Sequence, residues 1–214
     1  TANTRFAKGA VTSTGDVSEA EVAVTVAYGQ RAARCRTNQS ESAALQRAVE
    51  TASRLARLAP EDPERMPLLP PQRYARVPAA FDGATARLQA DARARAVGTL
   101  LSAGQAAALE LSGYYEHGST AIVRGNSAGL FAYHQSTEAE LSLTARTRDG
   151  SGSGWAAAYS NQAAALHAEA LAQVAVDKAR RAQSPRALAP GRYTVVLEPA
   201  AVADLLGFLL SALR

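Results

Sequence analysis

The chain has 214 residues, of which 47% are apolar and 20% are charged, as is usual for a folded globular protein. Its net charge is +4, but 21 of its 23 basic residues are arginines spread from end to end, and the densest patches are not interleaved with aromatic residues, so no nucleic-acid partner is expected. No run of about 18 apolar residues occurs, so no membrane partner is expected either.

Strand patterns dominate the first forty residues. Residues 5–13 are predicted to be extended, with a Lys-Gly turn in the middle. Residues 21–28 alternate apolar and polar side chains with the period of two that is typical of a half-buried strand. Gly29 and Gln30 then turn the chain into a predicted partner strand over residues 31–37.

Two helices follow, separated by a proline-rich connector. The first is predicted over residues 40–59, and Asn38 followed by Glu41 resembles a capping arrangement at its start. Residues 60–80 contain six prolines, too many for a regular element, and are expected to be extended. The second helix is predicted over residues 84–103. The first helix carries apolar residues at helical spacing: Leu45, Ala48, Val49, Ala52, Leu55 and Ala59.

The second half is predicted to contain most of the sheet. Residues 108–118 and 119–137 supply strands, and the Gly-Asn-Ser-Ala-Gly stretch at 125–129 tolerates the positive φ angles of a tight turn. Residues 138–146 alternate again. A third helix is predicted over residues 161–183, with an apolar face formed by Leu166, Ala170, Leu171 and Val174.

The last segment reads as a strand followed by an apolar helix. Residues 193–197 are rich in β-branched side chains, and Pro199 is suited to the first turn of a helix. The apolar face of that helix extends almost to the last residue, so we expect its packing surface to lie beyond Arg214. Because hairpins dominate the whole order, we predict an α+β fold with a mixed, largely antiparallel sheet and packed helices.

Few residues in the chain indicate a catalytic or metal-binding site. The three histidines, His117, His134 and His167, are spaced as in no helical metal motif; His134 is expected in the core or at a sheet edge, and His167 at the surface. Cys35 is the only cysteine, which fits a reducing, cytoplasmic location and excludes an internal disulfide bond.

The Asp-Gly-Ser-Gly-Ser-Gly-Trp stretch is the most unusual local feature. Gly150, Gly152 and Gly154 alternate, and Trp155 follows them. One interpretation is a mobile loop that faces a peptide or a partner and exposes its amide groups. The other is a flexible hairpin whose Trp155 side chain fills the core. The sequence leaves both open.

Three segments resemble the TldD/PmbA family, whose members are named as modulators of DNA gyrase and are understood as subunits of a zinc-dependent peptidase. In order they are NTRFAKGAVTS, NSAGLFAYHQSTEAELSLTARTRDGSGSGWA and PGRYTVVLEPAAVADLLGFL. The resemblance implies that residues 1–188 form the N-terminal α+β domain, truncated at its start. It also implies that residues 189–214 are the first strand and helix of a truncated C-terminal domain.

The resemblance further implies which kind of subunit this is. In the zinc-bearing TldD kind, a His-Glu-x-x-x-His motif lies on the helix that follows a strand like residues 193–197. Here that helix offers Leu205, Leu206 and Gly207, and Asp204 alone is able to bind zinc, which needs three or four donors. The chain thus resembles the PmbA/TldE kind, without a zinc site of its own and with zinc expected in a TldD-like partner.

The sequence is compatible with three functions. The first is the non-catalytic subunit of a TldD/TldE-type heterodimer that cleaves peptides or unfolded proteins, in which zinc-activated water in the partner attacks the peptide carbonyl. The second is a binding protein that modulates DNA gyrase or another protein partner without proteolysis. The third is a self-sufficient enzyme with an unfamiliar site. No catalytic residue is predicted in this chain.

Overall fold

The computed structural model describes residues 1–213 and divides the chain into two compact units. The first unit comprises Thr1–Gln183, and the second begins at Ser184. The two units are described separately below.

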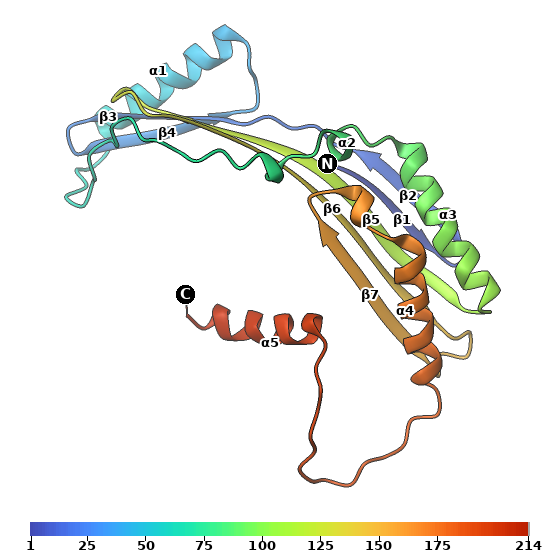
Figure 1. Cartoon of the computed structure of the whole chain (residues 1–214). Helices are drawn as coiled ribbons and strands as arrows, with labels where there is room; N and C mark the ends of the chain where they lie inside the picture. The colour runs from blue at the N-terminus through green and yellow to red at the C-terminus, as the bar shows by residue number, and fades with distance from the viewer. Residues whose placement is uncertain (214) are drawn as a thin grey trace. The chain divides into compact units, whose positions relative to one another are not determined.

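A five-stranded antiparallel sheet is the larger of the two sheets in the first unit (Figure 1). Its strand order is β2-β1-β5-β6-β7, so the N-terminal hairpin lies beside the hairpin formed by two strands from the middle of the chain. This arrangement confirms the predicted α+β fold with a largely antiparallel sheet. The strands are β1 (Ala2–Ala7), β2 (Ala10–Asp16), β5 (Glu110–Gly125), β6 (Phe131–Arg146) and β7 (Ser153–Ser160).

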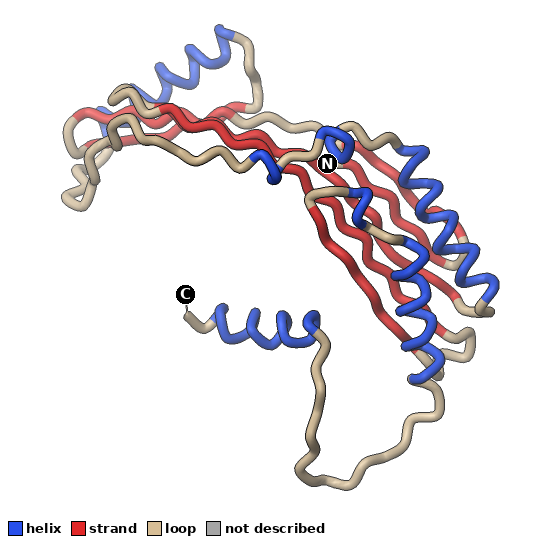
Figure 2. Tube along the Cα trace, in the orientation of Figure 1, coloured by secondary structure: helices blue, strands red, loops and turns tan. Residues whose placement is uncertain are grey.

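Two helices, α3 (Ala90–Ala106) and α4 (Ala168–Arg181), cover one face of this sheet (Figure 2). Every second residue of the strands faces them, as the pleat requires, and these residues form one buried core with the helices. The short helices α2 (Gly83–Ala86), η1 (Pro78–Ala80) and η2 (Ala163–Ala165) lie in the connections. The largest apolar core residues are Phe6, Val97, Leu100, Leu111, Leu141 and Leu143.

The buried face of α4 differs from the predicted one. Val174 was expected to be buried but is 45% exposed, whereas Ala172, Ala175 and Ala179 are fully buried. The face is therefore formed by small residues, because α4 lies very close to the backbone of β7. The predicted helix over 161–183 is also shorter, since α4 begins only at Ala168.

A second, two-stranded antiparallel sheet consists of β3 (Val22–Tyr28) and β4 (Arg31–Thr37), as predicted. Helix α1 (Ser42–Leu58) packs on one face of this ribbon through its buried residues, Ala44, Ala48, Ala52 and Ala56. Val49 and Leu55 were expected on the packed face, but each is 45% exposed. The prediction that Asn38 caps this helix was wrong, because the helix begins after Glu41 and no side chain caps it.

Strands β5 and β6 form one continuous hairpin, paired from Glu110 and Arg146 to Gly125 and Phe131. The sequence suggested breaks near residues 118 and 137, and the structure has none. The hairpin runs past the end of the five-stranded sheet to the β3–β4 ribbon, with the proline-rich connector beside it (Figures 1 and 2). The predicted helix over 84–103 is in fact two helices, α2 and α3.

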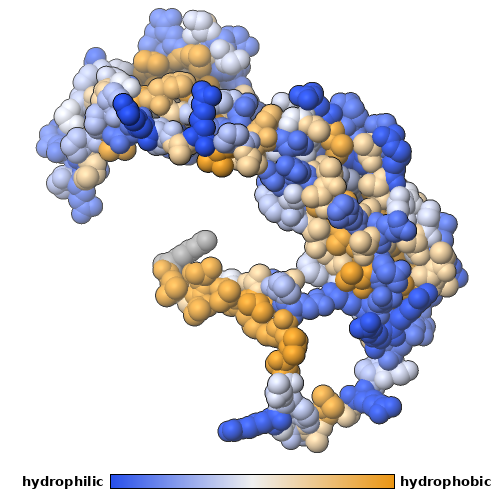
Figure 3. Space-filling view, in the orientation of Figure 1, coloured by the Kyte–Doolittle hydropathy of each residue, from blue (hydrophilic) through white to orange (hydrophobic). Residues whose placement is uncertain are grey.

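The second unit contains one helix, α5 (Pro199–Ser211). Residues 193–197 were predicted as a strand, but they form none, because none of the described residues pairs with them. The helix carries apolar side chains along its length, and they are exposed (Figure 3). Among residues 1–213, no helix combines the length and the apolar character needed to cross a bilayer.

Candidate functional site

Two cavities of the first unit lie between the β3–β4 ribbon and the β5–β6 hairpin. We call this space the ribbon–hairpin cleft. Its walls are the face of the ribbon opposite α1 and residues 119–130 of the hairpin and its turn. The ribbon face alternates along the strands, so that Thr25 and Arg34, which are paired across β3 and β4, lie on it together.

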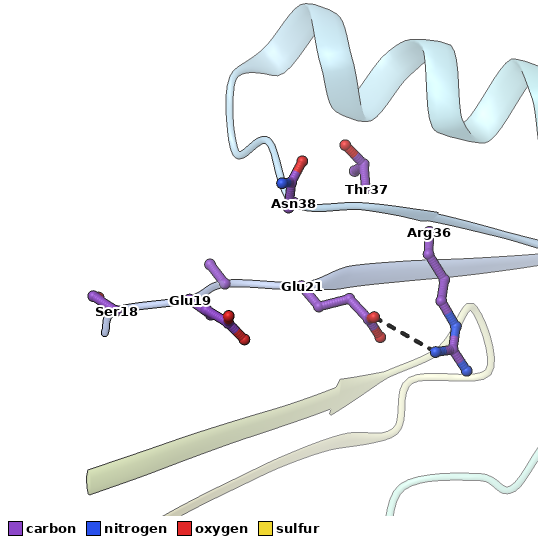
Figure 4. A pocket seen from close by; sticks show the side chains of 7 residues that line it. Ser18, Glu19, Glu21, Arg36, Thr37 and Asn38 are labelled. Atoms are coloured by element: carbon purple, nitrogen blue, oxygen red, sulfur yellow. Dashed lines mark hydrogen bonds and ion pairs between the residues drawn. The ribbon is translucent and has the colours of Figure 1, made fainter. Parts of the chain in front are cut away.

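One end of the cleft is acidic. Glu19 and Glu21 line a cavity of about 400 Å³ together with Phe81 and residues 119–121 of β5. Both carboxylates also border an adjoining cavity of about 730 Å³, in which Glu21 and Arg36 point toward one another (Figure 4). Their ion pair measures 3.5 Å, and both side chains are more than half exposed, so it contributes little to stability.

The other end of the cleft is basic. Arg34 of β4, Arg65 of the connector and Arg124 of β5 line a cavity of about 680 Å³. No Asp or Glu residue borders this cavity. Its apolar lining includes Ala23, Ala27, Leu68, Val123 and Leu130.

Hydrogen bonds hold the walls of the basic end together. The Asn126 side chain donates to the Leu69 carbonyl oxygen at 2.9 Å and accepts from the amides of Ala128 and Leu130 at 3.0 and 3.1 Å. This one residue therefore shapes the hairpin turn and fastens it to the connector. At the far end of the ribbon, the Asp62 amide donates to the Gln30 carbonyl oxygen at 3.0 Å.

A second polar cluster lies inside the five-stranded sheet, beneath α3. Arg93 is 1% exposed and donates to the His117 Nε2 atom at 2.8 Å and to the Thr4 hydroxyl at 3.3 Å. Arginine only donates, so Nε2 is the acceptor and the proton of the neutral ring sits on Nδ1. Burial first, and the Arg93 charge second, lower the pKa of His117. Arg93 also forms an ion pair with Asp16 at 3.4 Å, so the cluster joins α3 to β1, β2 and β5.

A third cluster joins the connector to the sheet. Asp82 accepts from the Thr85 amide at 2.7 Å and from the Thr85 hydroxyl at 2.6 Å, and these hydrogen bonds lower the pKa of the Asp82 carboxyl. The buried Thr85 hydroxyl in turn accepts from the Ala163 amide at 2.8 Å. Thr137 links the Asp82 amide to the Asn161 carbonyl oxygen. These bonds fix the start of α2 on the hairpin.

The sheet face opposite α3 and α4 is polar. Arg5 lies over the Tyr114 ring, 4.8 Å from its centroid, and the Tyr114 hydroxyl donates to Glu116. Burial and the Glu116 carboxylate raise the pKa of Tyr114 to about 12, so this phenol is protonated at neutral pH and is not poised as a base.

The glycine-rich stretch is not one open loop. Gly150 lies in a turn with φ +75°, whereas Gly154 and Trp155 belong to β7. A Cβ atom on Gly152 would lie 2.3 Å from the Ala179 carbonyl oxygen, and one on Gly154 would lie 2.2 Å from that of Ala175. These two glycines therefore allow α4 to pack on the strand.

Trp155 does not fill the core, because it is 46% exposed. It lies on the sheet face that α4 leaves open, paired across the strands with Thr144. Whether this face or the Gly150 turn meets a peptide or a partner stays a prediction.

The remaining predicted site residues do not converge. Leu205 and Leu206 are 58% and 51% exposed on α5, next to Gly207, and Asp204 is the only potential zinc ligand on that helix. The residues of α5 therefore do not fit a zinc ion. His134 and His167 are exposed. In residues 1–213, no three His, Cys, Asp or Glu side chains lie together as a metal site would require.

Three strands of the sheet (β5, β6 and β7), the two covering helices and the α2 region match a known domain. Residues 84–183 match the model of the PmbA/TldA metallopeptidase central domain. This segment is therefore similar to the central domain of that family. The resemblance of the sequence to the TldD/PmbA family is thereby confirmed.

Three solved structures extend the likeness in fold beyond this segment. A candidate modulator of DNA gyrase from Bacteroides thetaiotaomicron shares 20% identity over all of this chain and 51% of its own, with a TM-score of 0.78. A second candidate modulator, from Thermotoga maritima, shares 16% identity over 89% of this chain and 44% of its own, with a TM-score of 0.77.

TldE from Thermococcus kodakarensis shares 16% identity over 84% of this chain and 41% of its own, with a TM-score of 0.70. At these identities the likeness shows the fold. The chain spans about half the length of these structures or less. Among curated proteins, none matches the sequence.

The sequence interpretation missed the three arginines of the basic end. Arg34, Arg65 and Arg124 come from a strand, a connector and a hairpin end that are far apart in the chain. Only the position of Arg34 on the face of β4 opposite α1 was readable from the alternation, and nothing in the sequence indicated which other arginines would join it.

Proposed function

We propose that this chain is part of the non-catalytic, PmbA/TldE-like subunit of a TldD/TldE-type metallopeptidase complex that acts on peptides or unfolded proteins in the cytoplasm. The observation that carries the proposal is the match of residues 84–183 to the PmbA/TldA metallopeptidase central domain. Hydrolysis belongs to a zinc-bearing partner in a heterodimer, and this chain contributes to the walls that hold the peptide.

Two further observations support the proposal that this chain holds the peptide and a partner hydrolyses it. Helix α5 carries Leu205, Leu206 and Gly207 where the resemblance places the zinc motif, and its one carboxylate does not suffice to hold zinc. The fold is also that of a protein named TldE. The protein's own residues then bind and orient the peptide, and the ribbon–hairpin cleft offers a cavity of about 680 Å³ for that task.

The test is purification of the full-length protein that contains this chain from its own cells. We expect a second, related chain to co-purify, with about one zinc ion per pair, and cleavage of an unstructured peptide that stops when a chelator removes the metal. Purification of the protein alone, metal-free and inactive, would contradict the proposal.

A role as a binding protein that modulates DNA gyrase is the second candidate, because two of the similar structures are named as such modulators. Supercoiling assays with and without the purified protein separate the two. A change in gyrase activity that survives complete removal of zinc favours modulation over proteolysis.

A further inference from the structure

The basic end of the ribbon–hairpin cleft has an unusual balance of charge. Arg34, Arg65 and Arg124 share one cavity of about 680 Å³ without any acidic neighbour in its lining. Among the described residues, none of the three guanidinium groups has an ion-pair partner. The arginines just outside the cavity differ: Arg31 pairs with Glu61 at 3.6 Å, and Arg36 pairs with Glu21 at 3.5 Å.

Like charges gathered in one cavity repel each other, and each guanidinium group presents several N–H donors in a fixed plane. A carboxylate satisfies both needs, since it neutralises charge and accepts two parallel hydrogen bonds from one guanidinium. The cavity is thus complementary to carboxylates.

The rest of the lining narrows the ligand class. Leu68, Val123 and Leu130 give the cavity an apolar wall, and Asn126 and Ser127 add polar groups. No aromatic residue borders the cavity, so it offers no surface on which nucleic-acid bases stack. Aliphatic side chains and carboxylates on one ligand are characteristic of an acidic peptide.

The walls are fixed before any ligand binds. Asn126 fastens the hairpin turn to Leu69 of the connector, and the connector is hydrogen-bonded to the ribbon turn through Asp62 and Gln30. Arg34, Arg65 and Arg124 therefore project from segments that are tied to one another, which lowers the ordering cost of binding.

We propose that the basic end of the cleft binds Asp and Glu side chains of an extended peptide through Arg34, Arg65 and Arg124. This inference rests on the proposed function, because it names the substrate class that a peptide-holding subunit prefers. It assigns the selection of acidic segments to this chain and leaves bond cleavage to the partner.

The test is fluorescence anisotropy of a labelled nine-residue peptide in which Glu and Val alternate, titrated with the protein. A matched peptide carries Gln in place of Glu. We expect the Glu peptide to bind at least about tenfold more tightly, because charge-assisted hydrogen bonds to arginine are lost with Gln. The variant R34Q/R65Q/R124Q is expected to lose this preference.

The matched control variant is R54Q/R148Q/R181Q. It removes the same net charge from exposed arginines outside the cleft, and we expect it to bind the Glu peptide as the unchanged protein does. Circular dichroism verifies that both variants are folded. Equal affinity for the two peptides, or equal loss in the two variants, would overturn the inference.

A labelled oligothymidylate serves as a further probe. If the oligothymidylate binds as tightly as the Glu peptide and its binding is lost in R34Q/R65Q/R124Q, the site binds phosphate groups and the inference is wrong. The outcome is separable from that of the proposed function: peptide selection with no zinc-bearing partner would overturn the complex, whereas a zinc-bearing complex indifferent to Glu or Gln would overturn the cleft assignment.

Discussion

The close contact between β7 and α4 gives the sharpest prediction about stability. In Gly154→Ala, the new Cβ atom would lie 2.2 Å from the Ala175 carbonyl oxygen, 2.5 Å from the Ala179 amide nitrogen and 2.6 Å from the Lys178 Cβ atom. Two of these are backbone atoms of a helix, so no side-chain rotation relieves the clash. Helix α4 must move away from the strand by about 1 Å to restore ordinary contact distances.

That movement disturbs the core, because Ala175 and Ala179 are fully buried and belong to the main cluster. Overpacking in a well-packed core costs about 1–3 kcal/mol. With backbone on both sides of the clash, we expect a loss of about 3 kcal/mol, and hence a decrease in melting temperature of about 6–12 °C for a unit of this size.

The measurement is urea unfolding followed by circular dichroism, with thermal unfolding beside it. Gly152→Ala is expected to behave similarly, since its Cβ atom would lie 2.3 Å from the Ala179 carbonyl oxygen. Gly98→Ala is the control: it lies within α3 with nothing within 4 Å, and we expect it to stabilise by about 0.5–1 kcal/mol. If Gly154→Ala and Gly98→Ala unfold alike, the close packing of α4 on β7 is refuted.

Three further predictions concern buried polar groups. Folding lowers the pKa of His117, so the unfolded chain binds a proton at a higher pH than the folded chain does. The free energy of unfolding is therefore expected to decrease as the pH falls from 7 to 5, through the ordinary histidine pKa of about 6.5. In His117→Gln, the urea midpoints at pH 7 and pH 5 should differ less than in the unchanged protein. Arg93→Met leaves His117 Nε2 and the Thr4 hydroxyl without their donor and is expected to cost about 2–4 kcal/mol, part of which His117→Leu in the same chain should restore if the account is right. Thr85→Val keeps the side-chain shape but removes the acceptor of the buried Ala163 amide; we expect a loss of about 1–3 kcal/mol by urea unfolding, and an unchanged midpoint would contradict the hydrogen bond.

Local structure was largely predictable from the sequence. The alternation in residues 21–28, the glycine turn after it and the proline-rich connector each depend on neighbouring residues only, and the structure has all three. The turn at 125–129 was equally readable, because Asn126 there accepts hydrogen bonds from the amides that follow it.

The packed faces of the helices were harder to predict. Large apolar residues such as Val49 and Val174 mark a buried face under the usual assumption, yet both are 45% exposed, and alanines occupy the contacts. The reason is distance: Gly152 and Gly154 let α4 approach the β7 backbone so closely that only small side chains fit between them. A sequence pattern shows polarity and spacing but not the separation of two elements.

The same limit explains why the cleft was missed. The chain contains 21 arginines, and the composition does not indicate which of them lie together in the fold. The fold distinguishes them by their partners. Arg93 is buried and donates to Thr4 of β1, to Thr14 and Asp16 of β2 and to His117 of β5, so its guanidinium group connects α3 to three strands. Arg34 and Arg124 lie on facing walls of a cavity that contains no carboxylate, so their donors are available to a ligand. The absence of a carboxylate from the lining is what a binding site for acidic peptides requires.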